Sequence, residues 1–312
     1  MAKVSVIGAG NVGASAVYFI AKQNIADIVM VDVVPGLPQG KGLDFQHASP
    51  MQGYGVDVVG TNDYADIEGS DVVVHTAGIA RKPGMDRMDL LRTNVSIARD
   101  AAANVRKYAP DAVVIVVSNP LDVIAMMMLR ETGFPHQRVV GMAGILDSTR
   151  FRYFIAEKLG VLPADVQAMV LGGHGDSMVP LPRFTTVGGF PLSELMSDEE
   201  ITALSDRTRT GGGEVINYLK TGSAYYAPAA SAAAMVRAVL SNHKLVAPAS
   251  AYLQGEYGYE GIFLGVPVML GSEGVEKIYE LPLSDDETAA LARSAEAVRK
   301  GVADLDSILA EK

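Results

Sequence analysis

His174 is the side chain in this sequence whose surroundings best suit acid–base chemistry. It lies in Gly172-Gly173-His174-Gly175-Asp176, directly after an apolar run, residues 166–171, that predicts a strand. Because the neighbouring residues have no bulk, another group can approach the ring closely. An imidazole that titrates near neutrality can both donate and accept a proton. The same pattern also fits an ordinary histidine in a turn, and by itself it does not separate the two interpretations.

A carboxylate and a guanidinium lie upstream, in Asp147-Ser148-Thr149-Arg150. The segment predicts a helix that opens at Asp147 and runs to about Leu159. Positions i and i+3 share one face of a helix, so Asp147 and Arg150 should project together. The simpler interpretation is an acidic residue at a helix start with a local ion pair. The chemical one is a guanidinium that binds a carboxylate through two parallel hydrogen bonds, which lysine cannot reproduce.

The start of the chain carries a glycine pattern of a different kind. Gly8, Gly10 and Gly13 have the G-x-G-x-x-G spacing between an apolar strand, residues 4–7, and an apolar helical segment, residues 12–20. In such a turn the first glycine allows the tight bend, the second lets the backbone approach a pyrophosphate, and the third allows close helix–strand packing. The free N–H groups at the helix start then face the phosphates.

Asp32 strengthens this interpretation. It follows a second apolar strand, residues 28–31, at about the twenty-residue distance where the fingerprint places an acid on the ribose hydroxyls. A carboxylate there favours NAD, because it would repel a 2′-phosphate. A chance glycine-rich turn is the alternative. A signal peptide is a poor fit, because three glycines and Asn11 interrupt the uncharged run, and we expect residues 1–16 to be retained.

The elements that must position these groups alternate between strand and helix through the first half of the chain. This alternation predicts a parallel sheet covered on both faces, with ligands at the carboxyl ends of the strands. The predicted strands are 4–7, 28–31, 56–59, 71–76, 112–117 and 138–141, and the predicted helices between the later strands are 89–107 and 121–131. A charged segment with two glycines and a proline, residues 78–87, predicts either a mobile loop over a site or a solvated surface loop.

After about residue 143 the pattern changes. We predict two domains, residues 1–143 and 144–312, with a Rossmann-type doubly wound parallel sheet followed by an α+β domain. Within the second domain, Gly211-Gly212-Gly213 should begin a helix toward Tyr218, and residues 225–240 predict another. Segments 248–259 and 261–271 predict antiparallel strands. A capping box from Ser284 to Glu287 opens a C-terminal helix.

The composition excludes several classes of function. A chain of 312 residues is comfortable for two domains, and 49% hydrophobic residues with a mean hydropathy of +0.20 indicate a well-buried globule. A net charge of −10 without a basic block argues against nucleic acid or an anionic membrane surface as partner. The absence of cysteine excludes disulfides, thiolate catalysis and cysteine-ligated zinc, and it fits a cytoplasmic protein. We find no cluster of residues with metal-ligand spacing.

In this order the motifs resemble the lactate/malate dehydrogenase family over essentially the whole chain, and most closely its lactate-dehydrogenase-like malate dehydrogenases. The carrying motifs are Gly8-Ala9-Gly10-Asn11-Val12-Gly13, the segment 77–87, Ser118-Asn119-Pro120, Leu146-Asp147-Ser148-Thr149-Arg150 and Gly172-Gly173-His174-Gly175-Asp176. The resemblance implies reversible hydride transfer between (S)-malate and NAD, which gives oxaloacetate and NADH.

The resemblance also implies a role for each site residue. His174 would be the acid/base and Asp147 would hold its other ring nitrogen. Arg150 would bind the substrate carboxylate, Arg87 would stabilise developing oxyanion charge, and Asn119 would bond the substrate oxygen. The residues implied in cofactor binding are Gly8, Ala9, Gly10, Asn11, Val12, Gly13, Asp32, Asn94, Val117, Ser118 and Asn119.

The resemblance implies that Arg81 determines which substrate the protein prefers. Lactate enzymes of the family have a neutral side chain there, whereas oxaloacetate brings one more carboxylate and needs one more cation in a closed site. Ala224, in place of the usual threonine, leaves room for that carboxylate. The alternatives are a lactate or other 2-hydroxyacid dehydrogenase, and a non-catalytic NAD(H)-binding sensor. A homodimer or homotetramer is implied by resemblance alone.

Overall fold

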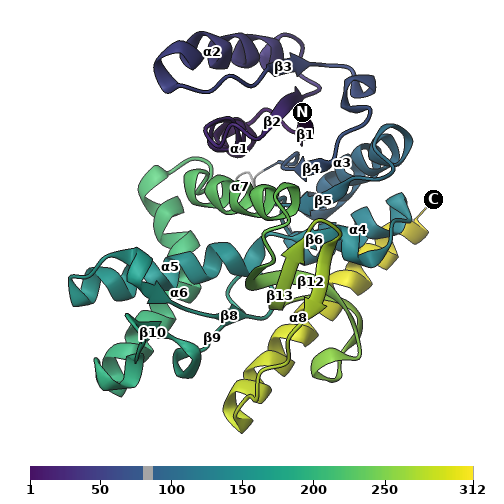
Figure 1. The fold of residues 1–312 in the computed structure, drawn as a ribbon. Coiled ribbons are helices and arrows are strands. Elements are labelled where there is room, and N and C mark those ends of the chain that lie inside the picture. Colours follow the sequence, from purple (N-terminus) through teal and green to yellow (C-terminus); the bar gives the residue numbers. More distant parts are fainter. Residues whose placement is uncertain (80–86, 312) are drawn as a thin grey trace.

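The computed structural model describes residues 1–79 and 87–311, and strands alternate with helices through the first half (Figure 1). The elements of this half are β1 (Ala2–Ile7), α1 (Asn11–Ala21), β2 (Ala26–Val31), α2 (Leu37–Gln52), β3 (Val58–Thr61), β4 (Val72–His75), α3 (Arg87–Tyr108), β5 (Val113–Val116), α4 (Leu121–Thr132) and β6 (Val139–Gly141). The second half contains α5 (Ala143–Leu159), β7 (Val166–Gln167), β8 (Val170–Leu171), β9 (Val179–Pro180), β10 (Thr186–Val187), β11 (Phe190–Pro191), α6 (Asp198–Leu219), α7 (Tyr226–Leu240), β12 (Leu245–Gln254), β13 (Glu260–Gly271), β14 (Gly274–Ile278) and α8 (Asp285–Ala310).

One large sheet organises the molecule. Among the described residues its strand order is β14-β13-β12-β6-β5-β4-β1-β2-β3, and the strands from β1 to β6 pair in parallel. The order 3-2-1-4-5-6 within this part is that of a Rossmann fold, which confirms the predicted fold class. The strands β12, β13 and β14 continue the same sheet in antiparallel pairing, with Ser250 of β12 opposite Gly141 of β6.

The parallel strands are short apolar runs because helices cover both of their faces. All four residues of β4 and of β5 are buried. The helix α1 packs against α7, as Figure 1 shows, and α3 packs against α4 and α8. Below this core, α5, α6 and the short strands enclose a smaller apolar cluster that includes Phe151, Ile155 and Met178. Among the described residues, no helix is long and apolar enough to cross a membrane.

Three details of the predicted elements are wrong. The helix with Asp147 begins four residues earlier, at Ala143, so Asp147 lies inside α5. The predicted strand 166–171 is two short strands, because β7 pairs with β10 whereas β8 pairs with β9 in another sheet. Gly211-Gly212-Gly213 does not begin a helix but lies within α6, whose start is fixed upstream by a capping box between Ser197 and Glu200.

A histidine is buried in the sheet itself. His75 ends β4 with no exposed surface, and neither of its ring nitrogens has a hydrogen-bond partner within the part of the chain that is described. Burial lowers the pKa of His75 from 6.5 to about 4, because the charged ring would lose its hydration. An unfolded chain therefore takes up this proton at a higher pH than the folded chain does, and stability must fall as the pH drops from 6.5 toward 4.

We therefore expect His75→Val to reduce the acid sensitivity of the fold. For the chain that has His75, the difference between the two pKa values corresponds to an unfolding free energy about 2 kcal/mol lower at pH 5 than at pH 7.5. Urea unfolding at pH 7.5 and pH 5, at one protein concentration, measures this loss, and the valine variant should lose about 2 kcal/mol less. The exposed His243, changed to glutamine, is the control. An equal loss for His75→Val and the unchanged chain would contradict the account.

Candidate functional site

The predicted binding residues follow three neighbouring strands at one edge of the sheet. Gly8 follows β1, Ala77 follows β4, and Asn119 follows β5. Because β1, β4 and β5 are adjacent and parallel, their carboxyl ends lie side by side. This edge is where open α/β sheets bind ligands.

The first and third glycines are required by close contacts. Gly8 has φ +103°, and a Cβ there would lie 2.8 Å from the amide nitrogen of Ala77. A Cβ on Gly13 would lie 1.8 Å from the carbonyl oxygen of Gly8, which no side chain can relieve. At Gly10 a Cβ would meet no atom within 4 Å, and no side chain caps the helix that follows. The turn is therefore closely packed at Gly8 and Gly13 and open at Gly10, where a diphosphate group would approach the start of α1.

Asp32 is tied to this turn by its own hydrogen bonds. The amide of Ala9 donates to Oδ2 of Asp32 at 2.7 Å, and the amide of Val34 donates to Oδ1 at 2.9 Å. From α2, Nζ of Lys41 donates to the carbonyl oxygen of Ala9 at 2.6 Å. The carboxylate is thus held at the carboxyl end of β2, beside the glycine turn, and the residues present fit a dinucleotide with free ribose hydroxyls.

Asn94 joins the segments that follow two of these strands. It is buried in α3, and its amide donates to the carbonyl oxygens of Ile79 at 3.2 Å and Asn119 at 2.8 Å while its Oδ1 accepts from Ile79 N–H at 2.8 Å. Ser118 Oγ donates to Ala77 O at 2.7 Å. Val117 is buried and its amide bonds to His75 O. These side chains fix the backbone at the sheet edge, and the side chain of Asn119 is exposed there.

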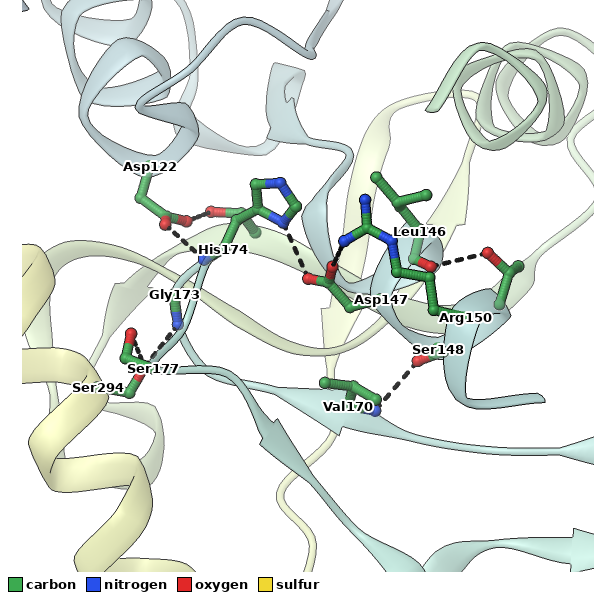
Figure 2. A network of polar contacts seen from close by, with 12 residues as sticks. Asp122, Leu146, Asp147, Ser148, Arg150, Val170, Gly173, His174, Ser177 and Ser294 are labelled. Atoms are coloured by element: carbon green, nitrogen blue, oxygen red, sulfur yellow. Dashed lines mark hydrogen bonds and ion pairs between the residues drawn. The ribbon is translucent and has the colours of Figure 1, made fainter. Parts of the chain in front are cut away.

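The structure brings three predicted residues together in the second half of the chain. Figure 2 shows Asp147 between the side chains of His174 and Arg150, with Oδ2 2.9 Å from Nδ1 of His174 and Oδ1 3.2 Å from Nη1 of Arg150. Asp147 is only 2% exposed. Since Nδ1 faces the carboxylate, the geometry assigns the ring hydrogen to Nδ1, and Nε2 is left to exchange a proton.

Charges around His174 oppose the effect of its burial. Burial lowers the pKa of His174, but the charge of Asp147 and its hydrogen bond raise it, and the net pKa lies above the ordinary 6.5. Arg150 lowers this pKa and Asp122 raises it by smaller amounts. These charges favour the protonated ring, and the ring can still release its proton near neutral pH.

The loop that carries His174 is anchored by residues that sequence reasoning missed. Asp122 Oδ2 accepts from the His174 amide at 2.9 Å, and Ser294 Oγ of α8 accepts from the Gly173 amide at 2.8 Å (Figure 2). Gly172 exchanges two backbone hydrogen bonds with Gly265 of β13. The one available signal in the sequence was an acid, Asp122, in an otherwise apolar stretch after Asn119-Pro120.

Two predicted arginines cannot be placed in this geometry. Arg81 lies outside the described residues, and Arg87 is described only as the first residue of α3. Their predicted roles therefore rest on the sequence. The site as described consists of the glycine turn with Asp32, the edge residues around Asn119, and the cluster of Asp147, Arg150 and His174.

Comparisons with known proteins cover both halves of the chain. A family model described as lactate/malate dehydrogenase, NAD binding domain, matches residues 2–141, and one described as lactate/malate dehydrogenase, alpha/beta C-terminal domain, matches residues 145–307. The first match confirms the NAD cofactor predicted from the glycine turn and Asp32.

Individual relatives are similar over nearly their full length. A malate dehydrogenase of Roseiflexus sp. (strain RS-1) is 52% identical over 306 residues, covering 98% of this chain and 99% of the relative. The malate dehydrogenase structure of Salinibacter ruber has a TM-score of 0.95 and 48% identity, with 99% of each chain covered. A lactate dehydrogenase of Cryptosporidium parvum, solved with lactic acid and nicotinamide adenine dinucleotide, has a TM-score of 0.94 and 46% identity, with 98% of each chain covered.

We expect Asp147→Asn to lower the pKa of His174. The asparagine keeps the shape of the side chain but removes the charge, so that burial of the ring is no longer outweighed. The measurement is an NMR titration of protein labelled at Cε1 of its five histidines, with His174→Gln for assignment. Asp57→Asn, at an exposed carboxylate, is the control and should leave the titration of His174 in place. An unchanged His174 pKa in Asp147→Asn would refute the electrostatic account.

Proposed function

The chain belongs to the lactate/malate dehydrogenase family, and from this premise we propose that it is an NAD-dependent malate dehydrogenase. The reaction is the reversible oxidation of (S)-malate to oxaloacetate, for which bound NAD supplies the hydride acceptor. The observation that carries the proposal is the position of the Asp147 carboxylate, 2.9 Å from His174 Nδ1 and 3.2 Å from Arg150 Nη1. A proton-exchanging ring and a carboxylate-binding group are thus held side by side.

His174 moves the proton of the reaction. In malate oxidation, Nε2 accepts the hydroxyl proton as the carbonyl forms, and the resulting imidazolium is stabilised by Asp147 at Nδ1. In the reverse direction the same imidazolium returns the proton to the carbonyl oxygen. The raised pKa of His174 suits the reductive direction, because the ring must begin that step protonated.

Arg150 orients the substrate. Its guanidinium, held on one side by Asp147, can bind the carboxylate next to the reacting carbon through paired hydrogen bonds. The neighbouring turn of α6 lies close to this guanidinium, because a Cβ on Gly212 would be in van der Waals contact, at 3.6 Å, with both Nη1 and Nη2 of Arg150. Asn119, exposed at the end of β5, would bond the substrate oxygen, and Arg87 would stabilise charge that develops on it.

Residues at the sheet edge hold the cofactor. The turn of Gly8, Ala9, Gly10, Asn11, Val12 and Gly13 would receive the pyrophosphate, and Asp32 the adenine-side ribose. Asn94, Val117 and Ser118 would shape the nicotinamide side, because their hydrogen bonds fix the backbone of residues 117–119.

Lactate dehydrogenase is the second candidate, because a solved lactate dehydrogenase shares 46% identity and the same fold. We favour malate because of Arg81, which supplies the cation that a second substrate carboxylate needs in a closed site. We also propose the domain division at 143/144, supported by family models that end at residue 141 and resume at 145. A cytoplasmic location and a homodimer or homotetramer stay predictions from the sequence.

NADH oxidation by the purified chain tests the function. Oxaloacetate should be reduced with a much higher kcat/KM than pyruvate, and NADH should be preferred to NADPH because Asp32 repels a 2′-phosphate. A higher kcat/KM for pyruvate would select the lactate alternative. Binding of NADH without reduction of either acid would select a sensor.

Arg81→Gln should change the substrate preference. Loss of one charge-assisted hydrogen bond, about 1.5–3 kcal/mol, corresponds to a fall of roughly ten- to one hundred-fold in kcat/KM for oxaloacetate relative to pyruvate. Lys82→Gln removes the same charge from the next residue and is the matched control. Should both variants keep the preference of the unchanged chain, the role of Arg81 is wrong.

A further inference from the structure

We propose that Asp122 is a positioning residue for the acid–base histidine, an inference that rests on the proposed function. Its carboxylate connects three segments far apart in the sequence, namely the first turn of α4, strand β12 and the loop of His174. Through these bonds it sets where the His174 backbone lies relative to Asp147. It does not touch the reacting atoms.

Both oxygens of the carboxylate are used. Oδ2 accepts from the His174 amide at 2.9 Å, as Figure 2 shows. Oδ1 accepts from Ser250 Oγ at 2.6 Å. Asp122 and Ser250 are buried, at 5% and 0% exposure. A charged acceptor shortens and strengthens such bonds, so the position of the His174 amide is better defined than a neutral contact would make it.

Stability alone is a poor reason for this carboxylate. Burial raises the pKa of Asp122, which shows that the site disfavours the charge, and its bonds to Ser250 and His174 only partly oppose this. A buried charged group rarely adds to the net free energy of unfolding, because its desolvation costs about as much as its contacts contribute. Apolar residues of similar size in its place often leave the stability of the fold unchanged or raise it. At the start of α4, an acid normally faces the helix N-terminus, whereas this one faces the histidine loop.

The place of Asp122 in α4 couples the two halves of the site. Three residues before it, Asn119 ends the β5 segment, and its carbonyl oxygen accepts from the buried Asn94. The start of α4 therefore connects two parts of the site. One is the sheet edge at Asn119, which would bind the substrate oxygen and the nicotinamide, and the other is the loop that carries His174. Asn119 and His174 must act on the same substrate oxygen, so their relative position is catalytically important.

The histidine ring responds to this placement through Asp147. Among the residues that the structure describes, three charged groups act on the ring, Asp147, Arg150 and Asp122, and of these Asp147 hydrogen-bonds to it. If the His174 backbone relaxes, the Nδ1 contact lengthens, and the pKa of His174 falls because burial is then less well opposed. Loss of the Asp122 charge alone would lower this pKa equally in an alanine and an asparagine variant, whereas loss of position lowers it further in the alanine variant.

The test compares Asp122→Ala with Asp122→Asn. Alanine removes both acceptors, whereas asparagine keeps the shape and one oxygen that can accept from His174 N–H, so the asparagine chain should fold even if the alanine chain does not. Glu296→Gln, at an exposed carboxylate of α8, is the matched charge control. The readouts are kcat, KM for oxaloacetate, the dissociation constant for NADH, the melting temperature, and the His174 titration by NMR.

For Asp122→Ala we expect kcat to fall by roughly 10- to 100-fold, since misplacement by about 1 Å can cost 100-fold. KM for oxaloacetate should change much less, because Arg150 lies on α5, and NADH affinity should be retained. The pKa of His174 should fall. Asp122→Asn should recover a large part of both kcat and this pKa.

Several results would overturn the proposal. These are an unchanged kcat and His174 pKa in both variants, or a lowered melting temperature without change in kcat and pKa. Equal effects of Glu296→Gln would also overturn it. The NMR titration needs no substrate, so it tests Asp122 even if the unchanged chain fails to reduce oxaloacetate, a failure that would remove only the proposed function.

Discussion

A buried carboxylate shared by a histidine and an arginine is the constraint on which the site depends. Asp147 is 2% exposed, and its two oxygens contact His174 and Arg150 separately. Such a carboxylate is tolerated in a low-dielectric interior only while its partners stay in place. The same interaction that neutralises it fixes the ring tautomer, raises the pKa of His174 and orients the guanidinium. Stability and chemistry are therefore not separable at this residue.

The mixed sheet explains how distant segments meet. Its parallel part places the glycine turn, Asp32 and Asn119 at one edge, because parallel strands end together. Its antiparallel continuation brings Ser250 of β12 opposite Gly141 of β6, and Gly265 of β13 against Gly172. The loop that carries His174 is thus fastened to the same sheet that carries the glycine turn. α5, which follows β6 directly, supplies Asp147 and Arg150 at that junction.

Local signals in the sequence were sufficient for much of this architecture. The Gly8–Gly13 spacing, Asp32, the i and i+3 pair of Asp147 and Arg150, and the glycine-flanked His174 all depend on short-range patterns. Asp122, Ser250 and Ser294 were missed because their contacts span 52 to 128 residues and no local pattern encodes them. The prediction that the glycines of α6 begin a helix was wrong. Gly211 lies close to Arg150 and Phe154, and Gly212 lies close to Arg150, a packing role that composition alone does not distinguish from a helix start.

The account makes one central claim, that the imidazole held by Asp147 exchanges the substrate proton. Its most direct test is His174→Asn, measured in parallel for NADH binding and for oxaloacetate reduction. We predict that the affinity for NADH is retained while kcat falls by about 100- to 10,000-fold, the usual contribution of general acid–base catalysis. Turnover within a few-fold of the unchanged chain would contradict the claim.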